Sequence, residues 1–283
     1  MKKAVLIALV VLASLQLSQA QEKEAGKTSP WKKGGHFGLI FAQSAFKNWT
    51  QGGEDAMSGN LKINYDINYK KDKHDWATKF IVNYGITRIG GINKKTDDLF
   101  EVNSIYGRKI NEAWNFTFYG NFKTQFTTGY DYTTTPFVKV SNSFAPAFLS
   151  FGPGLSYKKS DNFYINYAPV TSKFVIVTDA DLNALGAYGV EPGKSMRYEF
   201  GSNFQMFFKF DLMKNVTVEN TLNLFSNYLD QPQNVDVDNL FGLRMKVNKF
   251  LSAGLTLRTV YDDNTVKRVQ LSEVFGVEFG FDF

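Results

Sequence analysis

Hydrophobic and polar residues alternate along most of this chain with a period of two. The clearest example is the segment 114–126, where Trp114, Phe116 and Phe118 share one face and mostly polar residues occupy the positions between them. Because successive side chains of a β-strand point to opposite faces, this pattern predicts strands with one apolar and one polar face. The segment exceeds the roughly five or six residues of an ordinary globular strand, and its length suits a tilted strand that crosses a membrane.

Twelve segments of this kind are predicted, and the connections between them alternate between short and long. Barrels of bacterial outer membranes have an even number of strands, short periplasmic turns and longer external loops. The pattern therefore predicts an all-β fold, a transmembrane antiparallel up-and-down β-barrel with both termini in the periplasm. The segments span residues 36–43, 57–69, 76–88, 98–109, 113–127, 144–157, 163–177, 195–210, 215–228, 236–247, 250–261 and 271–283. The longer connections span 43–56, 90–97, 128–143, 178–194, 229–235 and 262–270.

The two ends of the chain carry targeting patterns. Lys2 and Lys3 precede an apolar stretch at 4–17 and small residues at 18–20, which predicts a cleavable signal peptide over 1–20. A polar periplasmic lead-in is expected over 21–33, and the barrel over 34–283. At the other end Phe279, Phe281 and Phe283 alternate with polar residues or glycine. This ending resembles the signal by which the barrel-assembly machinery recognises its clients.

Composition changes the picture in two ways. The chain has no cysteine, which excludes disulfides, thiolate metal sites and a cysteine nucleophile. Aromatic residues make up 16% of the chain, with 27 Phe and 14 Tyr, more than a soluble core needs and as expected for a lipid-facing surface with interfacial girdles. The formal net charge of +5 is too small to indicate a nucleic-acid partner.

Candidate chemistry is sparse, and no enzyme activity or cofactor is predicted. Of the two histidines, His36 alternates with the apolar residues Phe37 and Leu39, which favours a polar position in the lumen or at its rim. An outer-membrane lipid hydrolase would need its serine–histidine pair on the lipid-facing wall. Acidic pairs in the long loops, at 179–181 and 262–263, suit Ca²⁺ ligation or solvated loop charge, and the pattern favours the latter.

Several runs of residues resemble a known family in their order and spacing. They are NW with GG at 48–53, TQF with GY at 124–130, SFAPA at 143–147, GAYGVEPG at 186–193, and LFSNY with PQNVDV at 224–237. They resemble the Bacteroidota outer-membrane β-barrel family catalogued as domain of unknown function 3078. The resemblance implies an outer-membrane location in a Bacteroidota cell and supplies no catalytic residues.

The inward-facing charged residues are the candidates for a functional lumen. A mixture of both signs coats a narrow water-filled channel or, equally, forms ion pairs that close the bore. The long loop 178–194 is long enough to fold into the mouth, which makes Gly186, Gly189 and Gly193 candidate gate residues. The lumen candidates are Lys62, Asp66, Lys123, Arg197, Glu199, Arg244 and Lys246.

These observations favour a narrow channel or small-solute facilitator of the Gram-negative outer membrane. The alternative is a structural or accessory barrel whose loops or turns dock a partner protein, and a lipid hydrolase is the third reading. The expected partners are outer-membrane lipid and lipopolysaccharide, the barrel-assembly machinery, and small solutes or an unknown protein, with no nucleic acid.

Overall fold

The computed structural model describes residues 29–45 and 54–283. The predicted signal peptide, most of the predicted lead-in and the runs at 48–53 lie outside these residues. The chain divides into a unit that ends at Pro30 and a unit that spans Trp31–Phe283. Within the described residues, no helix is long and apolar enough to cross a membrane.

The second unit consists almost entirely of β-strands. Its elements are β1 (Trp31–Ser44), β2 (Ala56–Lys71), β3 (His74–Ile89), β4 (Ile92–Lys109), β5 (Trp114–Thr124), β6 (Gly129–Asp131), β7 (Val138–Ser141), β8 (Ala147–Ser160), β9 (Phe163–Ile176), α2 (Ala180–Ala184), the 3₁₀ helix η1 (Ala187–Gly189), β10 (Met196–Met213), β11 (Val216–Asn227), β12 (Val235–Lys246), β13 (Leu251–Asp262) and β14 (Val266–Asp282).

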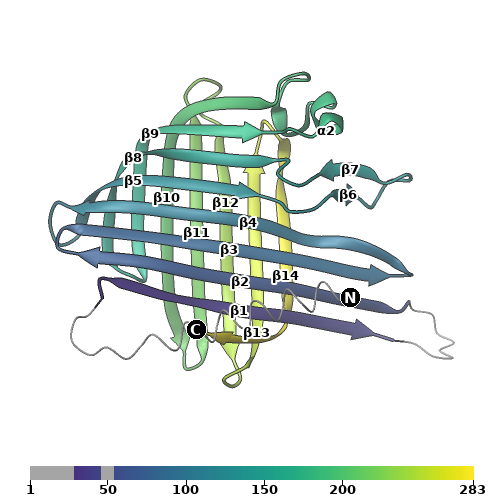
Figure 1. The fold of residues 1–283 in the computed structure, drawn as a ribbon, viewed down its shortest axis with the longest axis horizontal. Helices are drawn as coiled ribbons and strands as arrows, with labels where there is room; N and C mark the ends of the chain where they lie inside the picture. Colours follow the sequence, from purple (N-terminus) through teal and green to yellow (C-terminus); the bar gives the residue numbers. More distant parts are fainter. Residues whose placement is uncertain (1–28, 46–53) are drawn as a thin grey trace. The chain divides into compact units, whose positions relative to one another are not determined.

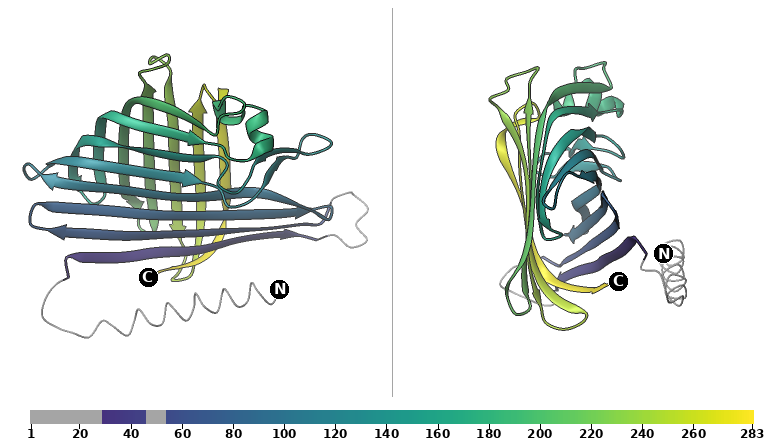
Figure 2. Two further views of the ribbon diagram at one scale, coloured as in Figure 1. Left: turned by 45° about the horizontal axis from the view of Figure 1, so that its top comes forward. Right: turned by 90° about the vertical axis from the view of Figure 1, so that its left-hand side faces the viewer.

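Twelve of these strands form one closed antiparallel barrel in the order β1-β14-β13-β12-β11-β10-β9-β8-β5-β4-β3-β2. Each strand pairs with its neighbours along the chain, and β6 with β7 forms a separate two-stranded hairpin within the connection from β5 to β8. Figure 1 shows the strands of the near wall crossing those of the far wall, as the tilt of barrel strands requires. Figure 2 shows β11–β14 on one side and β1–β5 on the other. The predicted twelve-stranded barrel is confirmed.

Two connections expected to be long are short, because their flanking strands extend further than the sequence pattern predicts. β3 and β4 continue to Ile89 and Ile92, joined by Gly90 and Gly91 with φ of 57° and 81°. A turn with positive φ at both central residues matches the twist of a hairpin, and glycine adopts it without steric cost. β14 begins at Val266, so the expected loop 262–270 is also mainly strand.

In this barrel apolar side chains face outward and polar side chains face inward, the reverse of their distribution in a soluble protein. Along β5, Phe116 and Phe118 are 61% and 52% exposed, whereas Thr117 and Tyr119 between them are 7% and 1% exposed. Aromatic residues also cluster near the short turns, where the ring centroid of Trp31 lies 4.8 Å from that of Tyr69. The outer surface is therefore apolar and the lumen polar, as a barrel in a membrane requires.

Prolines displace the register of the wall between β8 and β9. The pairing shifts between Phe151 and Leu155, so Pro153 and Pro169 fall in a bulge. Neither residue has an N–H to give to a ladder, and a bulge is where a strand tolerates this loss. Ala168 and Thr171, on either side of the bulge in β9, are both fully buried, so the lumen-facing parity changes from even to odd residues.

The barrel closes between its first and last strands through a short seam. β1 and β14 share five residue pairs, from His36–Asp282 to Ile40–Glu278, whereas β1 and β2 share fourteen. Gly35 and Phe283 add a reciprocal pair of backbone hydrogen bonds of 2.7 and 3.0 Å. The seam lies at the end of the barrel that carries the short turns, and this end is called the short-turn end below.

A glycine in β10 lies where the backbone of the neighbouring strand approaches closely. A Cβ atom at Gly201 would lie 1.8 Å from the carbonyl oxygen of Ser226, whereas one at Gly120 would meet nothing within 4 Å. We therefore expect Gly201→Ala to lower the free energy of unfolding by about 1–3 kcal/mol, the usual cost of overpacking. Urea unfolding in lipid vesicles measures the effect, with Gly120→Ala as the matched control. Equal stability of the two variants would contradict the conclusion that Gly201 has no room for a Cβ atom.

Candidate functional site

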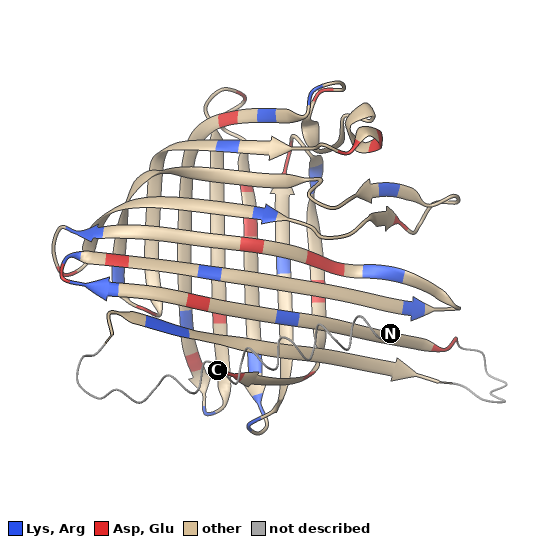
Figure 3. Cartoon of the chain, in the orientation of Figure 1, with Lys and Arg blue, Asp and Glu red and all other residues tan. Residues whose placement is uncertain are grey.

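A cavity of about 480 Å³ occupies the long-loop half of the lumen. Its wall includes Lys123 of β5, Lys173 of β9, Asp236 and Asp238 of β12, and Arg258 of β13. Figure 3 shows how charged residues recur along the strands that build this wall. Because these strands face one another across the barrel, the cavity is a charged chamber inside the lumen.

An ion-pair bridge crosses the lumen at the cavity. Lys123 Nζ lies 2.9 Å from Asp238 Oδ2, although β5 and β12 are not neighbours in the barrel. Arg258 holds the same carboxylate through two hydrogen bonds, from Nη2 to Oδ2 at 2.7 Å and from Nε to Oδ1 at 3.0 Å. Bidentate arginine contacts fix a carboxylate in orientation as well as position. Asp238 therefore joins two walls of the barrel.

A second charged cluster lies nearer the loops and is centred on Lys173. Its Nζ atom lies 2.6 Å from Asp236, 2.9 Å from Glu199 and 4.0 Å from Asp262. Glu199 is 1% exposed and also pairs with Arg197. Carboxylate oxygens of Asp236, Asp262 and Asp263 lie within 4.8 Å of one another. Acidic groups thus outnumber their cationic partners at this level of the lumen.

Further contacts cross the lumen between the cavity and the short-turn end. Lys62 of β2 donates to Thr256 of β13 at 2.9 Å, and Lys79 of β3 lies 3.1 Å from Glu219 of β11. Lys158 of β8 lies 2.9 Å from Asp75 of β3. None of these strand pairs are neighbours in the barrel, so the lumen is bridged at several levels.

The structure places the predicted lumen residues at different depths. Lys62, Lys123, Arg197 and Glu199 make the contacts described above. Asp66 is paired in register with Lys79, and Arg244 lies 3.3 Å from Asp282 near the seam. Lys246 is exposed at the short-turn end of β12, away from the cavity. Their part in conduction stays a prediction.

His36 belongs to a polar cluster at the seam. Its Nδ1 lies 2.7 Å from Asp282 and its Nε2 lies 2.8 Å from Glu278, which also accepts a hydrogen bond from Ser252 at 3.2 Å. Both ring nitrogens are thus engaged by carboxylates of the last strand. These contacts stabilise barrel closure, and they leave neither nitrogen for a serine nucleophile.

The connection between β9 and β10 forms a folded cap on the long-loop end, which comprises α2, η1 and residues 177–195. Leu182 and Val190 are each 1% exposed and pack with Val175 and Val177 in a small apolar core. The Tyr188 hydroxyl donates to the Val140 carbonyl of β7 at 2.7 Å, and its side chain borders the cavity. Burial raises the pKa of Tyr188 to about 12.

The three candidate gate glycines shape this cap. Gly186, Gly189 and Gly193 have φ of 65°, 69° and 85°, a region that favours glycine. A Cβ atom at Gly189 would lie 2.7 Å from the carbonyl oxygen of Asn264, so glycine also allows the cap to approach the β13–β14 turn. Whether the cap moves as a gate stays a prediction.

Charged pairs hold the cap against the β6–β7 hairpin. Lys139 of β7 lies 2.8 Å from Asp179, and it also pairs with Asp181. Asn142 donates to Asp179 at 2.7 Å. Both carboxylates of the pair at 179–181 are therefore engaged by a lysine, and the Asp181 side chain stays 79% exposed, as expected of solvated loop charge. These bonds, that of Lys139 first, lower the pKa of Asp179 to about 2.

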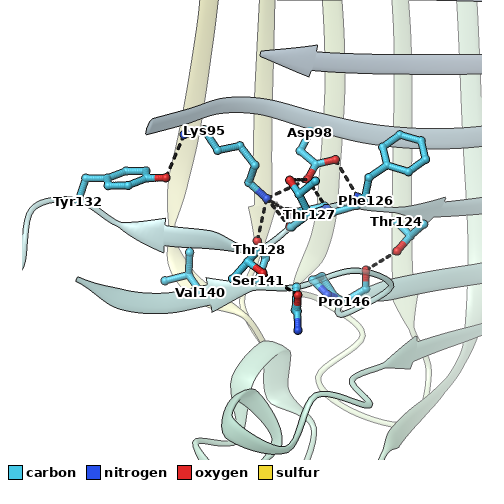
Figure 4. Close-up of polar contacts among 12 residues, drawn as sticks. Lys95, Asp98, Thr124, Phe126, Thr127, Thr128, Tyr132, Val140, Ser141 and Pro146 are labelled. Carbon is cyan, nitrogen blue, oxygen red and sulfur yellow. Dashed lines mark hydrogen bonds and ion pairs between the residues drawn. The ribbon is translucent and has the colours of Figure 1, made fainter. Parts of the chain in front are cut away.

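The hairpin is fastened in turn to β4 through Lys95 and Asp98 (Figure 4). Lys95 Nζ lies within hydrogen-bonding distance of Asp98 at 2.9 Å, Gln125 at 2.8 Å, the Thr127 carbonyl at 2.9 Å and Ser141 at 3.1 Å. Asp98 also accepts from the backbone N–H groups of Phe126 and Thr127. The Lys95–Asp98 pair thus connects the long-loop end of β4 to both ends of the β5–β8 connection.

Sequence reasoning missed Lys79, Lys173, Asp236, Asp238 and Arg258. Parity could have found Lys79, because it alternates with the outward-facing residues of its strand. Lys173 follows the bulge at Pro169, which inverts parity and conceals its inward position. Asp236 and Asp238 lie on inward positions of a segment in which only Arg244 and Lys246 are predicted, and no lumen residue is predicted in the segment that contains Arg258.

With this geometry established, comparison by sequence gives one family match. Residues 41–130 match the model of a family described as protein of unknown function (DUF3078). The match covers about a third of the chain and agrees with the resemblance that the sequence runs indicate. No curated protein matches the chain.

Solved structures of similar architecture share little sequence with this chain. The translocator domain of the autotransporter NalP from Neisseria meningitidis is 8% identical, with a TM-score of 0.36 over 99% of this chain and 98% of that chain. An outer membrane channel from Pseudomonas putida F1 is 9% identical, with a TM-score of 0.40 over 93% and 97%. The NanC porin is 12% identical, with a TM-score of 0.37 over 88% and 98%. These low scores transfer no function to this chain.

The low pKa of Asp179 gives the docked cap a defined acid limit. A carboxyl whose pKa is depressed in the folded state contributes stability above its unfolded pKa, near 3.9, and loses that contribution as the pH falls through the folded value. We therefore expect the cap to stay protected from hydrogen exchange at pH 4 and to open only near pH 2. Hydrogen exchange of residues 177–195 against pH measures this, with Asp179→Asn as the control that lacks the transition. Opening centred on pH 4 would contradict the assignment.

Proposed function

We propose that this protein is an outer-membrane barrel that passes small solutes slowly through a lumen gated by ion pairs. The observation that carries the proposal is the cavity of about 480 Å³ at the long-loop end, beside the Lys123–Asp238 contact that crosses the lumen. Cavities of this volume accommodate small molecules. A solute held there faces a bridge of charged side chains rather than an open bore.

The exterior of the barrel supports the membrane position. Large apolar side chains such as Phe116 and Phe275 are 61% and 66% exposed, which is unfavourable in water and suits lipid. In our proposal the short turns and both termini lie in the periplasm and the cap faces outside. Lipid and lipopolysaccharide surround the wall, and the assembly machinery reads Phe279, Phe281 and Phe283. We also propose a Bacteroidota origin, which is what the family resemblance implies.

The bridges favour a facilitator over a wide pore. Ion pairs in a confined lumen exclude solvent from the groups they join, and each bridge must separate before a solute passes. The free-energy cost of separating an ion pair is small when a charged solute or water replaces the lost partner. Selectivity then depends on the solute's ability to take over a contact with Lys123 or Asp238.

A specific observation favours a second candidate, an accessory barrel that docks a partner protein. Phe137, Val138 and Val140 on the β6–β7 hairpin are 42%, 45% and 43% exposed outside the barrel wall. An apolar patch on a polar loop is typical of an interaction surface. A lipid hydrolase has no such support, because His36 is held on both nitrogens by carboxylates.

Removing one end of the lumen bridge tests the channel proposal. We expect Lys123→Ala to raise single-channel conductance about two- to fivefold, because Asp238 keeps its bidentate partner Arg258 while the span between β5 and β12 is lost. The measurement is planar-bilayer conductance of the mature protein. Deletion of 179–193 should also raise conductance by uncovering the mouth.

The matched control is Lys246→Ala, which removes the same charge at the exposed short-turn end. It should leave the conductance of the protein unchanged. Silence of the native protein, Lys123→Ala and the deletion alike, with no swelling of liposomes, would exclude the channel and favour the accessory role.

A further inference from the structure

The long-loop half of the seam between β1 and β14 lacks strand pairing. β14 pairs with β1 only from residue 278 onward, so residues 266–277 have no β1 partner among the residues that the structure describes. The upper part of β4 also projects beyond its β5 partners, but the β5–β8 connection covers it through Lys95 and Asp98. In Figure 1 the last residues of β14 bend away from its upper part and approach β1.

Side chains on the unpaired part of β14 are exposed on both faces. Ser272 is paired in register with Arg258, so it shares the lumen face, and it is nevertheless exposed, as is Gln270. On the outer face Leu271 and Phe275 are 68% and 66% exposed, and the exposed Glu273 lies between them on the same face. By contrast, the Arg258 side chain on the adjacent strand is 24% exposed.

The cavity reaches this strip of β14. Its wall includes Gln270, Leu271 and Ser272 together with Arg258 and Asp262. At this level the chamber is therefore bounded on one side by a strand whose far edge pairs with no other strand of the described residues. An opening in the wall at this level would connect the cavity with the medium around the barrel, and not only with its two ends.

We propose that this part of the seam is a lateral portal through which an amphipathic amine moves between the cavity and the surrounding lipid. Unpaired backbone N–H and C=O groups are costly in hydrocarbon, so the edge requires water or a polar group beside it. Five acidic and three basic side chains line the cavity, and because Asp98 is already paired with Lys95, four acidic groups remain against three basic ones, which favours a cationic headgroup. The apolar chain would lie along Leu271 and Phe275. The inference rests on the proposed membrane position and not on conduction.

Paired cysteines test the opening directly, since the native chain has no cysteine. Leu39 and Phe279 are partners in the closed part of the seam. Continuation of that register would bring Gln43 opposite Phe275, with both side chains on the outer face. Residues paired across antiparallel strands lie at disulfide distance. In lipid nanodiscs we expect the control L39C/F279C to oxidise readily and Q43C/F275C at least tenfold more slowly. Equal rates would overturn the portal.

Binding of dodecylamine with a fluorophore at the end of its chain tests the ligand class in the same nanodiscs. We expect saturable binding that Asp262→Asn weakens about tenfold and that Glu112→Gln, at the opposite end of the barrel, leaves unchanged. Dodecanoate carrying the same fluorophore should bind at least tenfold more weakly. Stronger binding of dodecanoate, or no saturable binding of dodecylamine, would overturn the ligand assignment. Neither readout requires conduction, so failure here is distinguishable from a closed channel.

Discussion

The constraint on which the rest of the structure depends is the alternation of side chains along a closed hydrogen-bonded wall. Closure leaves backbone groups paired between strands, and alternation then assigns every second side chain to the outside. Because the outside takes apolar residues such as the exposed Phe116, charged side chains of the wall such as Lys123 and Asp238 occupy inward positions. A narrow lumen that receives charges of both signs has little water with which to solvate them. Ion pairing across the lumen is the consequence.

The cross-lumen contacts therefore have a mechanical as well as an electrostatic role. Lys123–Asp238 and Lys79–Glu219 join strands that are distant around the barrel, so they hold opposite walls together where the backbone ladder cannot. A wholly apolar filling would do this without leaving a place for solutes. The Lys123–Asp238 bridge stands beside a cavity of about 480 Å³, and breaking it would leave the backbone ladder of the wall unchanged. Under the proposed function, such a barrel is held closed by these contacts and still permits exchange of its lumen partners.

The sequence determines the local features of this fold more completely than the contacts made across the barrel. Alternation predicts the twelve strands and the inward position of Lys62 and Lys123, because both follow from a period of two. It does not predict that Lys123 meets Asp238, since their approach depends on the curvature of the whole wall. Pro169 conceals Lys173 by inverting parity at a bulge. The Gly90–Gly91 turn lies within a polar stretch that resembles a loop, although strand pairing continues to its edge.

The two ends of the barrel differ in how they are closed, and this difference organises the proposed site. At the short-turn end, tight turns and the His36 contacts to Glu278 and Asp282 join the first strand to the last. At the long-loop end, strand pairing between β1 and β14 stops, and a folded cap with its own apolar core stands beside the cavity. The Lys95–Asp98 pair covers the exposed edge of β4, whereas no described segment covers the edge of β14. The cavity, the cap and the incomplete seam thus occupy the same half of the molecule. In the proposed function, such a chamber exchanges its contents toward the long loops or the adjoining lipid more readily than through the bridged short-turn half.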